Sequence, residues 1–262
     1  MKTHGFNMLR KHIKIEPALF YYECDRLGMA VFQDFVNCGA YSFLRDTALP
    51  TLGIKKGIRV KRSEKMKEAF TETALGTQKL LAPYPSVLLY TVFNEGWGQF
   101  DADQTYRKFR KADPTRLYDS TSGWFRETES DVDSHHVYFK ALKLPTPKEK
   151  PLFLSEFGGY ACKIPGHSFV EQGEYGYRFF RDANAWEDAV IALYENEVLP
   201  LVEKGLCATV LTQLSDVEEE TNGLLTYDRL AKGDPARFAE VAKKIQGVWE
   251  NFVSRLEKTK TM

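Results

Sequence analysis

The stretch "YPSVLLYTVFNEGWG", residues 84–98, decides the fold and raises a question about chemistry. Its apolar and aromatic run from Val87 to Phe93 predicts a strand buried on both faces, as in a parallel sheet. The strand ends at Asn94 and Glu95, and a glycine and a tryptophan follow at once. A carboxylate at the mouth of a buried strand is costly to desolvate, so Glu95 needs either a partner or a function.

A second stretch, "PLFLSEFGGY" at residues 151–160, repeats this pattern around Glu156. Because the carboxyl ends of the strands in a parallel barrel share one rim, Glu95 and Glu156 can face each other across a cleft. Glycoside hydrolysis needs such a pair, in which one carboxyl protonates the leaving oxygen and the other attacks the sugar or activates water. A lone strand-end glutamate is more often a salt-bridge partner, but two in near-parallel contexts favour catalysis.

Short apolar segments alternate with longer amphipathic ones along the chain, which is typical of βαβ units and a parallel sheet. We predict seven strands, at Phe6–Arg10, Met29–Asp34, Ser86–Phe93, Leu117–Ser120, Asp133–Tyr138, Pro151–Ser155 and Ala208–Gln213. Helices are predicted at Pro17–Leu27, Ser63–Leu81, Asn184–Val202 and Ala236–Leu256. No repeat or break in composition appears, so residues 1–262 are predicted to form one α/β domain of the TIM (β/α)8 type.

Polar residues gather where the predicted strands end, on the face that carries the active site in such barrels. They are Asp34, Glu95, Ser120, His136, Tyr138 and Glu156. Within this set, Tyr138 could offer a flat apolar face to a sugar ring, together with Trp97 and Trp124. Trp97 taken alone is at least as often a packing residue, because buried tryptophan is common.

The bulk composition argues against several classes of partner. Lys plus Arg and Asp plus Glu number 36 each, so the chain has no net charge that would attract nucleic acid or an anionic membrane. A basic cluster without interleaved aromatic residues is expected to be a solvated loop; it comprises Lys55, Lys56, Arg59, Lys61 and Arg62. No apolar run approaches the roughly 20 residues of a membrane span. We expect a soluble protein, cytoplasmic if the first methionine is the natural start.

Metal and cofactor sites are not expected. His135 and His136 lie near Asp131 and Asp133, but adjacent residues on a strand point to opposite faces, so the two histidines cannot easily share an ion. His135 is expected to pack against helices. The four cysteines are scattered without a ligand spacing, and no phosphate-binding glycine motif is present. The acidic run at 216–223 is expected to be a solvated loop from which one carboxylate, Asp216 or Glu218, faces the pocket.

These motifs resemble glycoside hydrolase family 2, which holds β-galactosidases, β-glucuronidases and β-mannosidases. The matching segments, in chain order, are "GFNMLRKHIKIEPALFYYECDRLGMAVFQDF", "YPSVLLYTVFNE", "DVDSHHVYF", "PLFLSEFGG" and "NGLLTYDR". The resemblance covers nearly the whole chain and implies a retaining (β/α)8 barrel hydrolase that needs no metal or cofactor.

The resemblance also implies roles for individual residues. Glu95 would be the general acid/base and Glu156 the nucleophile. Asn94 would hold the 2-hydroxyl group of the sugar. Arg10, His136 and Tyr138 would line the pocket and hold or tune the nucleophile. The substrate-binding set that we predict is Asn94, Arg10, His136, Tyr138, Trp97, Trp124 and Asp34.

Two departures from the family pattern shape further expectations. Seven strands are predicted where the barrel needs eight, so we expect the first strand and helix, and the family's β-sandwich domains, to lie upstream. The open barrel edge could then pair with a second copy of the chain. The alternative function is a catalytically impaired carbohydrate-binding fragment.

The second departure concerns the substrate. Family glucuronidases bind the sugar carboxylate with an Asn-x-Lys pair, whereas residues 222–224 here are Asn-Gly-Leu. A buried carboxylate without a cation would be penalised, so a neutral hexoside such as a β-galactoside is expected. The last strand also offers Gln213 and Leu214 where many family members place a tryptophan.

Overall fold

The computed structural model describes residues 1–54 and 61–260, which form two compact units. One unit comprises residues 7–136, and the other comprises residues 1–6 and 137–262. Lys55, Lys56 and Arg59 of the basic cluster lie outside the described residues. Among the helices that are described, none combines the length and apolarity that a membrane crossing requires.

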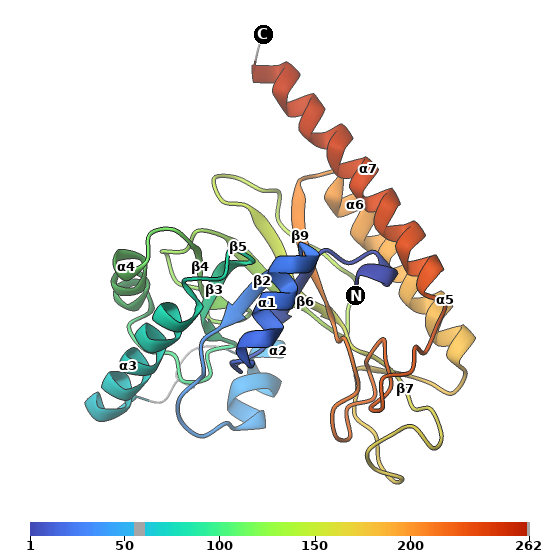
Figure 1. Ribbon diagram of the computed structural model, residues 1–262, viewed down its shortest axis with the longest axis horizontal. Coiled ribbons are helices and arrows are strands. Elements are labelled where there is room, and N and C mark those ends of the chain that lie inside the picture. Colours follow the sequence, from blue (N-terminus) through green and yellow to red (C-terminus); the bar gives the residue numbers. More distant parts are fainter. Residues whose placement is uncertain (55–60, 261–262) are drawn as a thin grey trace. The chain divides into compact units, whose positions relative to one another are not determined.

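Residues 7–136 contain a four-stranded parallel sheet with helices between its strands (Figure 1). The strands are, in spatial order, β1 (Met8–Lys11), β2 (Ala30–Asp34), β3 (Val87–Asn94) and β4 (Leu117–Ser122). The helices are α1 (Ala18–Leu27), α3 (Glu64–Leu81) and α4 (Ala102–Ala112). Two short helical turns, η2 (Leu44–Ala48) and α2 (Leu49–Thr51), lie in the connection between β2 and α3. The register pairs Asn94 with Ser122, so β3 and β4 end at the same level. This is the α/β arrangement with parallel strands that the sequence predicted.

Local sequence explains the limits of these helices. Ser63 caps α3, because its side chain accepts a hydrogen bond from the backbone N–H of Met66. The helix α4 was not predicted, because its sequence is mostly polar and buries only a narrow stripe around Phe109. The turns η2 and α2 were missed for a similar reason, since they are too short to show a helical period.

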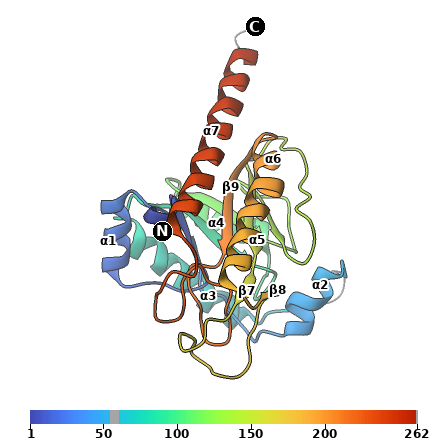
Figure 2. The same cartoon turned by 90° about the vertical axis from the view of Figure 1, so that its right-hand side faces the viewer.

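The second unit contains two parallel strand pairs and a layer of helices. In it, β6 (Leu152–Gly158) pairs with β9 (Leu206–Thr212), and β7 (Tyr160–Cys162) pairs with β8 (Arg178–Phe180). The helices are α5 (Ala183–Leu193), α6 (Leu199–Val202) and α7 (Pro235–Lys260), and α7 runs alongside α5 and α6 in both views (Figures 1 and 2). Strand β5 (Asp133–Val137) crosses the boundary between the units. Every predicted strand therefore overlaps an observed one.

The predicted helix at 184–202 is interrupted rather than continuous. A π-helical turn, η3 (Tyr194–Val198), separates α5 from α6. Pro200 follows within the first turn of α6, and a proline lacks the N–H that the α-helical ladder requires there. The core beneath these helices is apolar and aromatic, and Trp186, Val198 and Phe157 are almost fully buried in it.

The first residues of the chain pack on α7. Gly5 follows a short 3-10 turn and has a φ of 82°. A Cβ atom at Gly5 would lie 2.6 Å from Cβ of Ala242 and 2.9 Å from Cα of Ala239. The close approach of these two segments therefore depends on glycine at this position.

We expect Gly5→Ala to lower the free energy of unfolding by about 2 kcal/mol, because it adds both a steric clash and an unfavourable backbone conformation. Gly247 on α7 has open space around its Cα, so Gly247→Ala should raise the free energy of unfolding by about 0.5–1 kcal/mol. Urea unfolding of the two variants beside the wild type measures both effects. Equal stability of the two variants would contradict the packing of the first residues on α7.

Candidate active site

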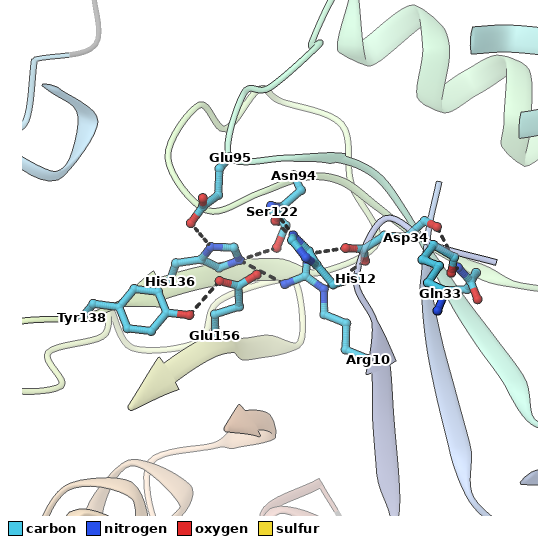
Figure 3. A network of polar contacts seen from close by, with 11 residues as sticks. Arg10, His12, Gln33, Asp34, Asn94, Glu95, Ser122, His136, Tyr138 and Glu156 are labelled. Atoms are coloured by element: carbon cyan, nitrogen blue, oxygen red, sulfur yellow. Dashed lines mark hydrogen bonds and ion pairs between the residues drawn. The ribbon is translucent and has the colours of Figure 1, made fainter. Parts of the chain in front are cut away.

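A buried guanidinium, that of Arg10, organises the polar residues at the ends of β1 to β4 (Figure 3). Its Nε and Nη2 donate to the two carboxylate oxygens of Asp34 at 2.9 and 3.0 Å. Nη2 also donates to Oδ1 of Asn94 at 2.8 Å. The side chains of Arg10 and Asp34 are only 3% and 1% exposed, so each charge is desolvated and compensated by the other.

The amide of Asn94 has a defined orientation as a result. Its Oδ1 accepts from Arg10, and its Nδ2 lies 3.1 Å from Nε2 of His12. An amide nitrogen carries two hydrogens, so Asn94 can donate one to His12 and keep the other for a ligand. His12 was not among the predicted site residues, although it lies in the first motif of the family resemblance.

The network also sets the tautomer of His136. Its Nε2 lies 3.2 Å from Nη1 of Arg10, which can only donate, so Nε2 must accept. Oγ of Ser122 lies 2.8 Å from the same nitrogen. The ring proton therefore belongs on Nδ1, which donates to Oε1 of Glu95 at 2.8 Å. His136 thus contacts the carboxyl group of Glu95.

Glu95 occupies a strained turn at the end of β3. Its φ is 53°, and its backbone N–H donates to the carbonyl oxygen of Ser122 at 2.8 Å. Gly96 and Gly98 both have a φ of 76°. A Cβ atom at Gly96 would overlap the ring of Phe125, and one at Gly98 would lie 2.5 Å from the carbonyl oxygen of Cys38. The glycines after Glu95 are therefore required by the turn that presents the carboxyl group.

Burial raises the pKa of Glu95 to about 7. The nearby His12 and Arg10 act to lower the pKa, and the carboxylates of Asp34 and Asp46 act to raise it. The side chain keeps 18% of its surface exposed. A carboxyl group that is desolvated in this way holds its proton near neutral pH and can act as a general acid.

In residues 137–262, Glu156 is held by a hydrogen-bonded chain of Tyr138 and Thr212. The hydroxyl of Tyr138 donates to Oε2 of Glu156 at 2.8 Å (Figure 3). Oγ1 of Thr212 lies 2.7 Å from the same hydroxyl. A tyrosine hydroxyl has one hydrogen, so Thr212 is the donor to Tyr138. The ring of Tyr138 stacks on that of Tyr177 with centroids 4.1 Å apart. Thr212 was missed, because the sequence marks it only as one residue of a predicted strand.

The remaining predicted residues have varied surroundings. Asp34 serves as the ion-pair partner of Arg10. Trp97 packs edge to face with Tyr41, and its indole N–H donates to the carbonyl oxygen of Gly39 at 2.8 Å. The ring of Trp124 packs against that of His136, and its buried Nε1 has no hydrogen-bond partner among the described residues. A buried donor without a partner is uncommon in folded proteins, which sets Trp124 apart from the other residues of this network.

The structure adds partners for two charged residues and corrects one expectation. His135 lies 3.1 Å from a carboxylate oxygen of Asp133, and its packing against helices stays a prediction. Asp216 is not in a solvated loop, since its side chain is 1% exposed and accepts from Lys232 at 2.7 Å. A pairing across sixteen residues cannot be seen in the composition of an acidic run.

Comparison with known proteins identifies the fold. No protein-family model matches the sequence, and no curated protein sequence matches it. Among solved structures, a GH2 β-galacturonidase from Eisenbergiella tayi is 16% identical with a TM-score of 0.62, covering 92% of this chain and 45% of that one. A β-D-glucuronidase from Dictyoglomus thermophilum is 19% identical with a TM-score of 0.60, covering 93% and 45%. A β-D-mannosidase from the same organism is 17% identical with a TM-score of 0.59, covering 92% and 35%.

The chain thus spans less than half the length of these enzymes. At such low identity the similarity establishes a shared fold, and the chemistry must be argued from the residues themselves. The fold of this chain is similar to that of family 2 glycoside hydrolases, as the resemblance in the sequence predicted.

The raised pKa of Glu95 predicts a pH-dependent cost in stability. In the unfolded chain the carboxyl group ionises near 4.5, whereas in the folded protein it ionises near 7. Between these pH values the unfolded chain loses its proton first, so the free energy of unfolding falls as pH rises. Glu95→Gln removes this cost and should raise the free energy of unfolding by about 2–3 kcal/mol at pH 8, with little gain at pH 4.

Chemical unfolding at the two pH values measures the gain. Glu72→Gln, which removes an exposed glutamate from α3, is the matched control and should show no such pH dependence. A gain at pH 8 that equals the gain at pH 4 would show that Glu95 is not held in its neutral form.

Proposed function

We propose that this protein hydrolyses β-glycosides by a retaining double displacement, with Glu95 as the general acid/base and Glu156 as the nucleophile. The observation that carries the proposal is Glu95 itself, a buried carboxyl group whose pKa is raised to about 7. It accepts a hydrogen bond from His136 and adjoins Asn94, whose amide is fixed by Arg10. A proton donor of this kind suits the protonation of a glycosidic oxygen near neutral pH.

In each step of the mechanism Glu95 transfers a proton, and Glu156 forms or breaks its bond to the anomeric carbon. In the first step, Glu156 attacks the anomeric carbon, the bond to the leaving oxygen breaks, and Glu95 gives its proton to that oxygen. In the second step, Glu95 takes a proton from water, the water oxygen attacks the anomeric carbon, and the ester to Glu156 breaks. A retaining mechanism of this type requires the two carboxyl groups to lie about 5–5.5 Å apart.

The hydrogen bonds of Glu156 fit the role of nucleophile. Tyr138 donates to Oε2 and is itself held by Thr212, so one carboxyl oxygen has a fixed donor. A fixed donor restricts rotation of the carboxyl group, so the other oxygen keeps a defined direction. Asn94 would bind the 2-hydroxyl group through the hydrogen that His12 leaves free.

The finer architecture is part of the same proposal. The parallel order β1-β2-β3-β4 and the parallel pairing of β6 with β9 support a (β/α)8-type barrel. We infer that the chain serves as one catalytic domain of this type.

For the sugar, we propose a neutral hexoside such as a β-galactoside. Two of the similar structures are named as uronidases and one as a mannosidase. The lysine that follows the Asn-Gly-Leu segment is Lys232, whose side chain is fully buried. Its Nζ donates to Asp216 and to the carbonyl oxygen of Thr221, both at 2.7 Å. This cation is committed to the protein, which disfavours a uronate substrate.

Hydrolysis of nitrophenyl β-galactoside, β-glucoside, β-mannoside and β-glucuronide tests the proposal. We expect turnover of one neutral sugar, and a loss of at least about a thousandfold in kcat for Glu156→Gln. Glu95→Ala should recover turnover when azide is added, because azide attacks the sugar–enzyme ester without a base, and the product should be the β-glycosyl azide. Glu72→Gln is again the control.

Other outcomes separate the alternatives. An α-configured azide product would contradict retention. A folded wild-type protein that hydrolyses none of these glycosides but binds a sugar in calorimetry would contradict catalysis. It would favour the alternative of a carbohydrate-binding fragment.

The contact of Thr212 with Tyr138 predicts a second effect on the same reaction. Thr212→Val keeps the shape of the side chain but removes the hydroxyl that donates to Tyr138, so kcat should fall by about tenfold. Thr212→Ser restores the donor and should recover most of the activity. Steady-state kinetics of the two variants measures the difference, and equal rates would show that the hydroxyl is not needed.

A further inference from the structure

Near Glu95 lies a group of apolar side chains, three exposed and one half-buried, that the proposed mechanism does not use. We call it the aromatic wall and define it as Tyr41, Phe43, Leu44 and Trp97. The rings of Tyr41 and Trp97 meet edge to face, with centroids 5.4 Å apart and an interplanar angle of 65°. Tyr41 is 49%, Phe43 57% and Leu44 63% exposed. Such an apolar surface next to a catalytic group is typical of a ligand-binding site.

The wall is tied to the turn that presents Glu95. Trp97 is two residues beyond Glu95, and its backbone N–H donates to the carbonyl oxygen of Asn94 at 3.0 Å. The indole N–H of Trp97 donates to Gly39, which belongs to the segment that carries Tyr41. The backbone of Cys38 leaves no room for a side chain at Gly98. The two segments are therefore packed together at the end of β3.

The charge of Asp46 also links the wall to the carboxyl group of Glu95. Asp46, in the turn that follows Phe43, accepts from the backbone N–H of Ser42 at 2.7 Å. Its carboxylate is close enough to Glu95 to raise the pKa of that group. The segment at 38–46 therefore packs against Gly98 at one end and has the charge of Asp46 near Glu95 at the other.

We propose that the aromatic wall binds the aglycone, and that the preferred aglycone is apolar and aromatic. This inference rests on the proposed function. A general acid must lie within hydrogen-bond reach of the leaving oxygen, so the leaving group departs on the side of Glu95, where the wall begins. The wall is built from flat and aliphatic surfaces, which suit an aromatic ring.

A second sugar suits the wall less well. The hydroxyl groups of a sugar need hydrogen-bond partners when they are buried. The indole N–H of Trp97 is already donated to Gly39, Phe43 and Leu44 offer no polar group, and Tyr41 adds a single hydroxyl, whereas a sugar carries several. The wall therefore favours a leaving group that has no hydroxyls beyond the one released from the glycosidic bond, such as a phenol or an arylalkyl alcohol.

A matched pair of substrates tests this specificity. The 2-phenylethyl and ethyl β-glycosides of one sugar both release primary alcohols, so their chemical steps are similar and the ratio of their kcat/KM values reports aglycone binding. We expect the wild type to prefer the phenylethyl glycoside by about tenfold or more, and Trp97→Ala and Tyr41→Ala each to reduce that ratio several-fold. Tyr22→Ala, which removes a tyrosine that is 56% exposed on α1, should leave the ratio unchanged.

Three outcomes would overturn the inference while leaving the proposed function intact. One is a wild-type ratio near one. Another is a ratio that neither wall variant alters. The third is a disaccharide hydrolysed faster than the phenylethyl glycoside, which would show that a sugar occupies the wall.

A wild type that hydrolyses neither glycoside contradicts the proposed function, and binding then decides the role of the wall. Saturable quenching of tryptophan fluorescence by the phenylethyl glycoside but not the ethyl glycoside, lost in Trp97→Phe, would support the aromatic wall as a binding site. The absence of quenching would overturn it.

Discussion

The buried ion pair of Arg10 and Asp34 fixes the chemistry of residues 7–136. A guanidinium that is 3% exposed would be costly without its partner, and breaking such a pair typically costs about 3–5 kcal/mol. With both carboxylate oxygens engaged by Nε and Nη2, the remaining donors of Arg10 have fixed directions. One of them orients the amide of Asn94, and another makes Nε2 of His136 an acceptor. The proton of His136 then points at Glu95. The tautomer of His136 is thus set by the guanidinium of the Arg10–Asp34 ion pair.

The same region shows how a site can be built at the expense of stability. Glu95 adopts a left-handed backbone conformation that side chains rarely occupy, and its carboxyl group is desolvated enough to raise its pKa to about 7. Neither feature benefits folding. Both are sustained by neighbours that leave little freedom, namely the glycines at 96 and 98 and the packed backbone of Cys38. Backbone conformations and buried carboxyl groups that are unfavourable by themselves, but are held in place by their surroundings, are typical of functional sites.

The sequence predicted the strands well because each is a short apolar run bounded by turn residues, and a parallel sheet buries both faces of such runs. It also placed Glu95, Asn94, His136, Tyr138 and Glu156 at strand ends. The partners of these residues were harder to predict. Ser120 was expected at the rim, but β4 continues to Ser122, and two further residues along a strand place Ser122 on the same face, beside His136. His12 and Thr212 are common residue types whose role depends on contacts across many residues, to Asn94 and Tyr138. Nothing local in the sequence encodes such contacts.

The similarity to uronidases and a mannosidase sets a limit on what a fold can say about a substrate. At 16–19% identity the backbone path is shared, while the groups that would contact a sugar have been free to change. Lys232 illustrates that a lysine can be present in this part of the chain and still be unable to bind a substrate carboxylate. Its Nζ donates to Asp216 and Thr221, and its side chain has no exposed surface, so an added carboxylate would have to displace an existing ion pair. Displacing a buried partner leaves an uncompensated charge, which costs more than a new pair of the same kind would return. The charge of a substrate is therefore better inferred from which basic side chains are already paired within the protein than from the names of proteins with the same fold.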